Sequence, residues 1–140
     1  MTSDGGYAFL EHTADVGVRV WGQTLAQLLT EAAKGLTELL VTDSPVAAKE
    51  ARPIALTAAA PDELVRLWLT ELLFWFATDR FLVAECQLEA TDTSITGQVL
   101  GERFQPKRHA QGTEVKGVTY HQFEVTRTSH GWEAQVIFDV

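Results

Sequence analysis

A histidine and an aspartate occur together in the motif His12-Thr13-Ala14-Asp15-Val16-Gly17, at the junction of two short predicted strands. An imidazole can move protons or bind a metal, and a carboxylate is a preferred ligand of hard cations. Asp and His at a turn more often shape it through hydrogen bonds to the backbone. On spacing alone, the structural role is therefore favoured for this motif.

A second group of carboxylates lies at the end of the sequence. An alternating strand from Trp132 to Phe138 is predicted, and it leads to Asp139 and then to Val140 with its own carboxylate. Two carboxylates this close repel each other, and a hard cation such as Ca²⁺ or Mg²⁺ would relieve that repulsion. The simpler interpretation is a frayed, solvated terminus, which the sequence alone favours.

The segment 114–121 is the predicted hairpin partner of this last strand, and it carries Lys116 and His121. If the turn lies at 129–130, Tyr120 and His121 fall near Asp139 across the ladder, although sequence does not determine the register. His121 alone is more often a hydrogen-bonded structural residue than a metal ligand or a base.

Basic residues gather between positions 103 and 116, in a segment that Pro106 and Gly112 mark as a loop. The group consists of Arg103, Lys107, Arg108, His109 and Lys116. Such a run is more often a solvated loop than a nucleic-acid patch, and the former interpretation is favoured here.

The usual catalytic signatures are missing from the sequence. It contains no phosphate-binding glycine loop, no dinucleotide fingerprint, no nucleophile elbow and no HExxH motif. Cys86 is the single cysteine, which excludes an internal disulfide and a CxxC-type zinc site. Because Cys86 falls on the apolar face of a predicted strand, an inert buried thiol is expected.

Length and charge narrow the protein class further. The chain has 140 residues, of which 46% are hydrophobic, so one globular domain spanning 1–140 is expected. The formal charge of −8 disfavours broad binding to nucleic acid. The first residues lack a basic region followed by an apolar run, and no stretch is long enough to span a membrane, so a cytoplasmic protein is predicted.

Two helices and several strands account for most of the chain. Leucines and alanines at helical spacing predict a helix over 25–40, begun by a capping box at Thr24 and Gln27. Pro61-Asp62-Glu63 begins a second helix that ends near Thr78. The remaining segments alternate as strands do, and those at about 115–127 and 132–139 flank a hairpin signal at 128–131. This pattern predicts an α+β fold, a two-layer sandwich of two helices on a mostly antiparallel sheet.

Four blocks of the sequence resemble the archease family: HTADVG at 12–17, GERFQPKRH at 101–109, VKGVTYH at 115–121 and VIFDV at 136–140. They occur in the family's order, and the resemblance covers essentially the whole chain. It implies an α+β fold related to the SHS2 (strand-helix-strand-strand) module. Archeases are cofactors of the GTP-dependent RNA ligase that joins 3′-phosphate or 2′,3′-cyclic phosphate ends to 5′-hydroxyl ends in tRNA splicing and RNA repair. They promote guanylylation of the ligase and so permit multiple turnover.

The same resemblance assigns roles to individual positions. Asp15, Asp139 and the carboxylate of Val140 match the ligands of a divalent cation, expected to be Ca²⁺, with Mg²⁺ or Mn²⁺ as alternatives. Lys116 matches a functional lysine. The motif histidines are His12, His109 and His121, whose roles are less defined. Gly117 stands where many relatives carry alanine.

The prediction is therefore an accessory protein and not an enzyme, with the GTP-dependent RNA ligase as partner, no membrane association, and direct RNA binding weak or absent. Two other classes stay open. One is an independent metal-dependent phosphoester hydrolase that uses Asp15 and Asp139. The other is a chaperone-like protein or nucleic-acid adaptor that uses the basic loop at 103–116.

Overall fold

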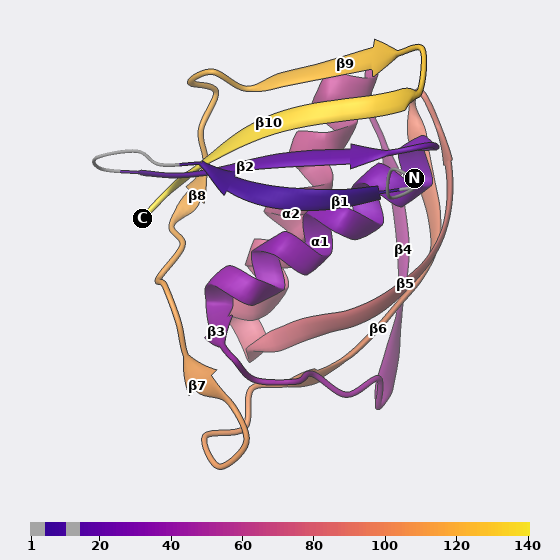
Figure 1. The fold of residues 1–140 in the computed structure, drawn as a ribbon. Coiled ribbons are helices and arrows are strands. Elements are labelled where there is room, and N and C mark those ends of the chain that lie inside the picture. Colours follow the sequence, from indigo (N-terminus) through magenta and orange to yellow (C-terminus); the bar gives the residue numbers. More distant parts are fainter. Residues whose placement is uncertain (1–4, 11–14) are drawn as a thin grey trace.

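The main sheet brings together strands from both ends of the chain, in a computed structural model that describes residues 5–10 and 15–140 (Figure 1). Its strands lie in the order β1 (Gly5–Leu10), β2 (Asp15–Gly22), β10 (Gly131–Asp139) and β8 (Gly117–Val118), and β9 (Glu124–Thr128) also pairs with β10. A second sheet has the order β4 (Glu50–Thr57), β6 (Ser94–Arg103), β5 (Phe81–Thr91). Two short strands, β3 (Val41–Thr42) and β7 (Ala110–Gln111), pair separately. Every pairing among the described strands is antiparallel.

The first helix, α1, spans Leu25–Leu40 and begins where the capping signal predicts. The Thr24 hydroxyl accepts a hydrogen bond from the Gln27 amide at 3.1 Å, which satisfies one of the unpaired amides of the first turn. The Gln27 side chain reaches back to the amide of Gln23, one residue before the cap, at 2.7 Å. The sequence therefore predicted both bounds of this helix correctly.

The second helix, α2, spans Pro61–Asp79, one residue beyond the predicted end. Pro61 supplies a preset backbone angle at the start, and Asp62 and Glu63 complement the positive end of the helix dipole. Arg80 ends the helix in the left-handed conformation, with φ of 64°. In the described part of the chain, no helix combines the length and the apolar character needed to cross a membrane.

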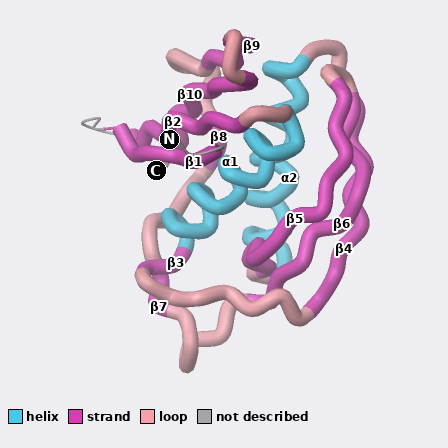
Figure 2. The backbone as a smooth tube through the Cα atoms, turned by 45° about the vertical axis from the view of Figure 1, so that its right-hand side comes forward, coloured by secondary structure: helices cyan, strands magenta, loops and turns pink. Residues whose placement is uncertain are grey.

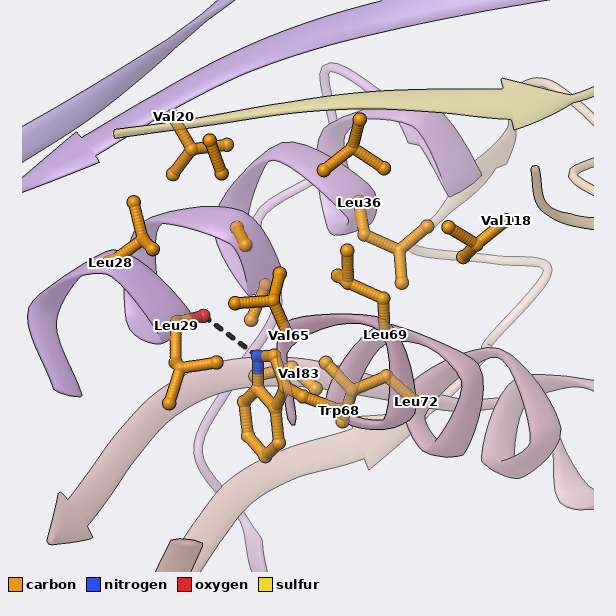
Figure 3. Close-up of a cluster of buried hydrophobic side chains, with 14 of the residues drawn as sticks. Val20, Leu28, Leu29, Leu36, Val65, Trp68, Leu69, Leu72, Val83 and Val118 are labelled. Atoms are coloured by element: carbon orange, nitrogen blue, oxygen red, sulfur yellow. Dashed lines mark hydrogen bonds between the residues drawn. The ribbon is translucent and has the colours of Figure 1, made fainter. Parts of the chain in front are cut away.

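Both helices lie between the two larger sheets (Figures 1 and 2). Helix α1 contacts β1, β2 and β10 on one side and β5 on the other, whereas α2 contacts β4, β5, β8 and β9. Leu36, Leu69, Leu72 and Val118 meet in the shared core, where Trp68 is 0% exposed (Figure 3). The Trp68 indole donates a hydrogen bond to the carbonyl of Leu29 at 2.8 Å, which joins α2 to α1. The predicted α+β fold with two helices and antiparallel strands is confirmed, but the helices lie between two sheets rather than on one face of a single sheet (Figures 1 and 2).

Two segments differ from the sequence prediction. The strand expected over about 115–127 is divided into β8 and β9 by the turn 119–123, in which Gln122 has a φ of 51°. The loop expected after Glu102 is shorter than predicted, because β6 runs through Arg103 and β7 pairs with β3. The turn between β9 and β10 lies at Ser129 and His130, as the sequence predicted.

Candidate functional site

The two candidate aspartates are direct neighbours across the main sheet. Asp15 is the first residue of β2, Asp139 is the last residue of β10, and the antiparallel register pairs them with each other. Residues directly opposite in an antiparallel pair point to the same face, with Cβ atoms about 5 Å apart. The fold therefore brings together two carboxylates from opposite ends of the sequence.

The core holds this end of β10 in place. Phe138, the residue before Asp139, is buried. It pairs with Val16 of β2 on one side and with Val118 of β8 on the other. Because successive side chains alternate in a strand, a buried Phe138 directs Asp139 to the opposite, exposed face. Val140 follows and packs in part against the core.

Lys116 lies on the other side of Asp139. The backbone amide of Lys116 donates a hydrogen bond to the Asp139 carbonyl at 2.7 Å, and Gly117 pairs with Asp139 in the register of β8. The Lys116 side chain is exposed. One end of the main sheet thus carries Asp15, Asp139, Val140 and Lys116, which we call the carboxylate tip.

The donor atoms of the carboxylate tip fit a hard divalent cation. Like charges directly opposite in a sheet are unfavourable, so Asp15 and Asp139 gain from a shared cation. In the described part of the chain, no three His, Cys, Asp or Glu side chains cluster as a metal site, and Asp15 and Asp139 are the two carboxylates that the register brings together here. An all-oxygen set suits Ca²⁺, Mg²⁺ or Mn²⁺ rather than zinc.

The prediction that Tyr120 and His121 lie near Asp139 was wrong. Continuing the register of β9 along β10 would place Tyr120 opposite Asp139, but β8 places Gly117 there. The turn 119–123, between β8 and β9, accounts for this shift of register. His121 lies exposed in that turn, where its amide donates to the Thr119 hydroxyl at 3.2 Å. Tyr120 is 75% exposed.

Comparison with known proteins identifies the family of the chain. The model of the Archease protein family (MTH1598/TM1083) matches residues 7–140, which include every residue of the carboxylate tip. This chain belongs to the archease family. Curated archeases from Methanosarcina acetivorans and Methanopyrus kandleri are 36% and 35% identical to it, over 96% and 94% of this chain and 95% and 96% of their own lengths.

Two solved structures show the same archease fold. The solution structure of protein 1598 from Methanobacterium thermoautotrophicum has a TM-score of 0.82 and 31% identity, and the match covers 96% of this chain and 99% of that one. A crystal structure from Thermotoga maritima, described as an archease and possible chaperone, has a TM-score of 0.66 at 17% identity and covers 94% of both chains. The latter likeness concerns the fold alone.

Of the archease-motif histidines that the structure describes, neither belongs to the carboxylate tip. His109 is buried beside Glu102, just before β7, and Figures 1 and 2 show β7 well separated from β8. His121 lies in the exposed turn described above. His12 falls outside the described residues. Among the candidate residues that the structure describes, the carboxylate tip therefore contains Asp15, Lys116, Asp139 and Val140.

Two members of the basic group at 103–116 form ion pairs with acidic side chains. Arg103 lies 3.8 Å from both Glu50 and Asp79, and Arg108 forms a two-pronged ion pair with Glu102. A hydrogen bond from Arg52 lowers the pKa of Asp79 below its usual range. Arg103 and Arg108 are thus paired with acids, whereas Lys107 and Lys116 are exposed.

Glu102 is the residue that sequence reasoning missed. It is 3% exposed, and although burial raises its pKa, hydrogen bonds from the Arg108 side chain and the Ala47 amide outweigh that effect and lower the pKa to about 2. The only local signal is the arginine and histidine that follow it six and seven positions later.

Cys86 is half-buried in β5 and packs against the core. Burial raises the pKa of its thiol to about 12, so the thiol is protonated at neutral pH. A protonated thiol is a poor nucleophile. The structure agrees with the inert role that the sequence predicted.

Proposed function

We propose that this protein is an accessory activator of a GTP-dependent RNA ligase that joins 3′-phosphate or 2′,3′-cyclic phosphate ends to 5′-hydroxyl ends in tRNA splicing and RNA repair. It promotes guanylylation of the ligase and thereby multiple turnover. Membership of the archease family supports this role. The observation that carries it is the direct pairing of Asp15 with Asp139, with the Lys116 amide bound to the Asp139 carbonyl.

The carboxylate tip has the chemistry to organise a phosphate-bearing site on a partner. A divalent cation held by Asp15, Asp139 and the Val140 carboxylate would offset the negative charge of phosphate oxygens. Lys116, whose amide binds the Asp139 carbonyl at the same end of the sheet, adds a second positive group that can bind phosphate by a charge-assisted hydrogen bond. Because β2, β8 and β10 hold these residues through backbone pairing, the tip is arranged before the partner binds, which lowers the cost of organising the reacting groups.

The charge of the chain favours a protein partner. With a net charge of −8, the protein is repelled by the RNA backbone but is attracted to the basic surface that an RNA-binding ligase needs. Direct RNA binding is therefore expected to be weak or absent. The partner contacts the carboxylate tip, and the activator performs no covalent chemistry of its own.

Ligation turnover tests the proposal. The RNA ligase from the same source is kept limiting over RNA ends, with GTP and Mn²⁺ or Mg²⁺, and the product formed per ligase is measured with and without this protein. We expect a change from about one product per ligase to many, because an activator of guanylylation permits repeated cycles. No change with an active ligase and a folded protein would refute the activator role.

Asp139→Asn tests the tip itself. Asp139 is exposed at a strand end, so the variant keeps the fold while it loses one carboxylate. Glu133→Gln is the matched control, because Glu133 is an exposed acid on the same strand and the same face. The proposal requires that Asp139→Asn abolish activation and that Glu133→Gln retain it. Normal activation by Asp139→Asn would exclude the carboxylate tip as the active surface.

A further inference from the structure

Glu102 is a buried acid on which several segments converge. It lies near the end of β6, and both of its carboxylate oxygens have partners. Arg108 contacts Oε1 at 2.6 Å and Oε2 at 2.7 Å, the Ala47 amide donates to Oε2 at 2.6 Å, and the Lys49 ammonium lies 3.7 Å from Oε1. Paired arginine–carboxylate bonds combine strength with a defined geometry. Glu102 therefore ties the start of the 104–116 segment to the chain that precedes β4.

His109 completes this arrangement. Its Nδ1 accepts a hydrogen bond from the Gln105 amide at 2.9 Å, so the neutral ring must carry its proton on Nε2. Nε2 is buried and lies 3.2 Å from Glu102 Oε2, without the alignment of a hydrogen bond. The ring is thus held between the backbone of its own turn and the buried carboxylate. In this position it is not available to a partner protein.

The segment 104–116 makes further backbone contacts on its way to the carboxylate tip. The Ala110 amide donates to the Ser44 hydroxyl, and the amides of Gly112 and Thr113 donate to the last carbonyls of α1. The segment then reaches Lys116, whose amide binds the Asp139 carbonyl. Only two of its residues, Ala110 and Gln111, belong to a strand. Phe104 and Val115 pack in part against the core, so Glu102, Arg108 and His109 fix the first half of a path whose second half has contacts of its own.

We propose that Glu102, Arg108 and His109 form a buried clamp that positions Lys116 at the carboxylate tip. This inference rests on the proposed function, because it takes Lys116 as the group that acts on the ligase. The clamp residues touch neither the cation nor the partner. They fix the backbone of the segment that leads to Lys116. His109 is therefore a positioning residue rather than a metal ligand.

Hydrogen exchange tests the positioning without any ligase. Arg108→Gln removes the two-pronged partner of Glu102, and Arg108→Lys keeps the charge. Lys107→Gln is the control, because Lys107 is an adjacent exposed cation that forms no ion pair with the described residues. Losing one partner of a buried charge should raise the exchange rates of the amides of residues 109–116 in Arg108→Gln by about tenfold. Exchange in β10 upstream of Phe138 should be unchanged, Arg108→Lys should be intermediate, and Lys107→Gln should match the original protein. Unchanged exchange over 109–116 in Arg108→Gln would overturn the clamp.

A double-variant cycle in the turnover assay then shows whether the clamp acts through Lys116. Arg108→Gln and Lys116→Ala should each lower the maximal turnover, and Arg108→Gln should cause no further loss in the Lys116→Ala background. Additive losses would mean that Arg108 acts elsewhere and would overturn the inference. Full activation by Lys116→Ala would instead refute the proposed role of Lys116, whereas the exchange measurement would still decide whether the clamp fixes the segment.

Discussion

Asp139→Asn should change stability in opposite directions depending on whether a cation is present. Without a cation, Asp15 and Asp139 face each other across β2 and β10 and repel. Two unit charges about 5 Å apart in an exposed setting repel by about 0.8 kcal/mol. Removing one charge should therefore stabilise the cation-free protein by up to about 0.8 kcal/mol.

When a cation is present, Asp139→Asn should instead destabilise the protein relative to the original. A ligand that binds only the folded state stabilises it by about 2.7 kcal/mol at a concentration one hundred times its dissociation constant. The original protein should gain this stabilisation on adding Ca²⁺ or Mn²⁺, and Asp139→Asn should lose most of it. For a chain of this length, the gain corresponds to a rise in Tm of roughly 6–10 °C.

Thermal unfolding followed by circular dichroism measures both effects, first with a chelator and then across a cation titration. Glu133→Gln serves as the control, since it removes a carboxylate from the same face of β10 without touching the Asp15–Asp139 pair. Two results would refute the reasoning. One is a Tm of the original protein that no divalent cation changes. The other is an Asp139→Asn variant that is clearly less stable than the original protein in chelator.

Three further predictions concern stability. The pKa of Glu102 is lowered from 4.5 to about 2, so the ionised carboxylate should add about 3 kcal/mol to the free energy of unfolding at pH values above 4.5. This contribution is lost as the pH falls toward 2. Urea denaturation at a series of pH values should therefore show a shallower acid decline for Glu102→Gln. Trp68→Phe should cost about 1–3 kcal/mol, because the Leu29 carbonyl loses its buried donor, and equal urea midpoints for the two proteins would contradict this. Gly117→Ala should be neutral, since an added Cβ meets nothing within 4 Å, whereas Gly131→Ala should lower the Tm, because its φ is 133° and its Cβ would lie 2.3 Å from a backbone oxygen.

The sequence predicted the parts of the fold that local signals control. Thr24 and Gln27 marked the start of α1, and Pro61 with two acidic residues marked the start of α2. These signals act within one helical turn, so they can be identified without knowing the rest of the fold. The hairpin turn before Gly131 was predicted for the same reason.

The parts that failed depend on contacts between distant segments. Gly117 rather than Tyr120 lies opposite Asp139, because a turn between β8 and β9 shifts the register, and register depends on the packing of a whole strand. Glu102 was missed because its burial follows from how β6 meets the segment before β4. The family resemblance, and not any local pattern, assigned Asp15 and Asp139 to one ligand set, and their pairing across β2 and β10 was not predicted.

The pairing of β2 with β10 has a consequence for when the carboxylate tip exists. Asp15 is synthesised early and Asp139 late, so an emerging chain carries one half of the tip long before the other. Neither carboxylate has its neighbour until β10 has inserted between β2 and β8. A nascent or partly unfolded copy therefore lacks the tip altogether, and a partner that recognises the tip selects for molecules that have completed folding.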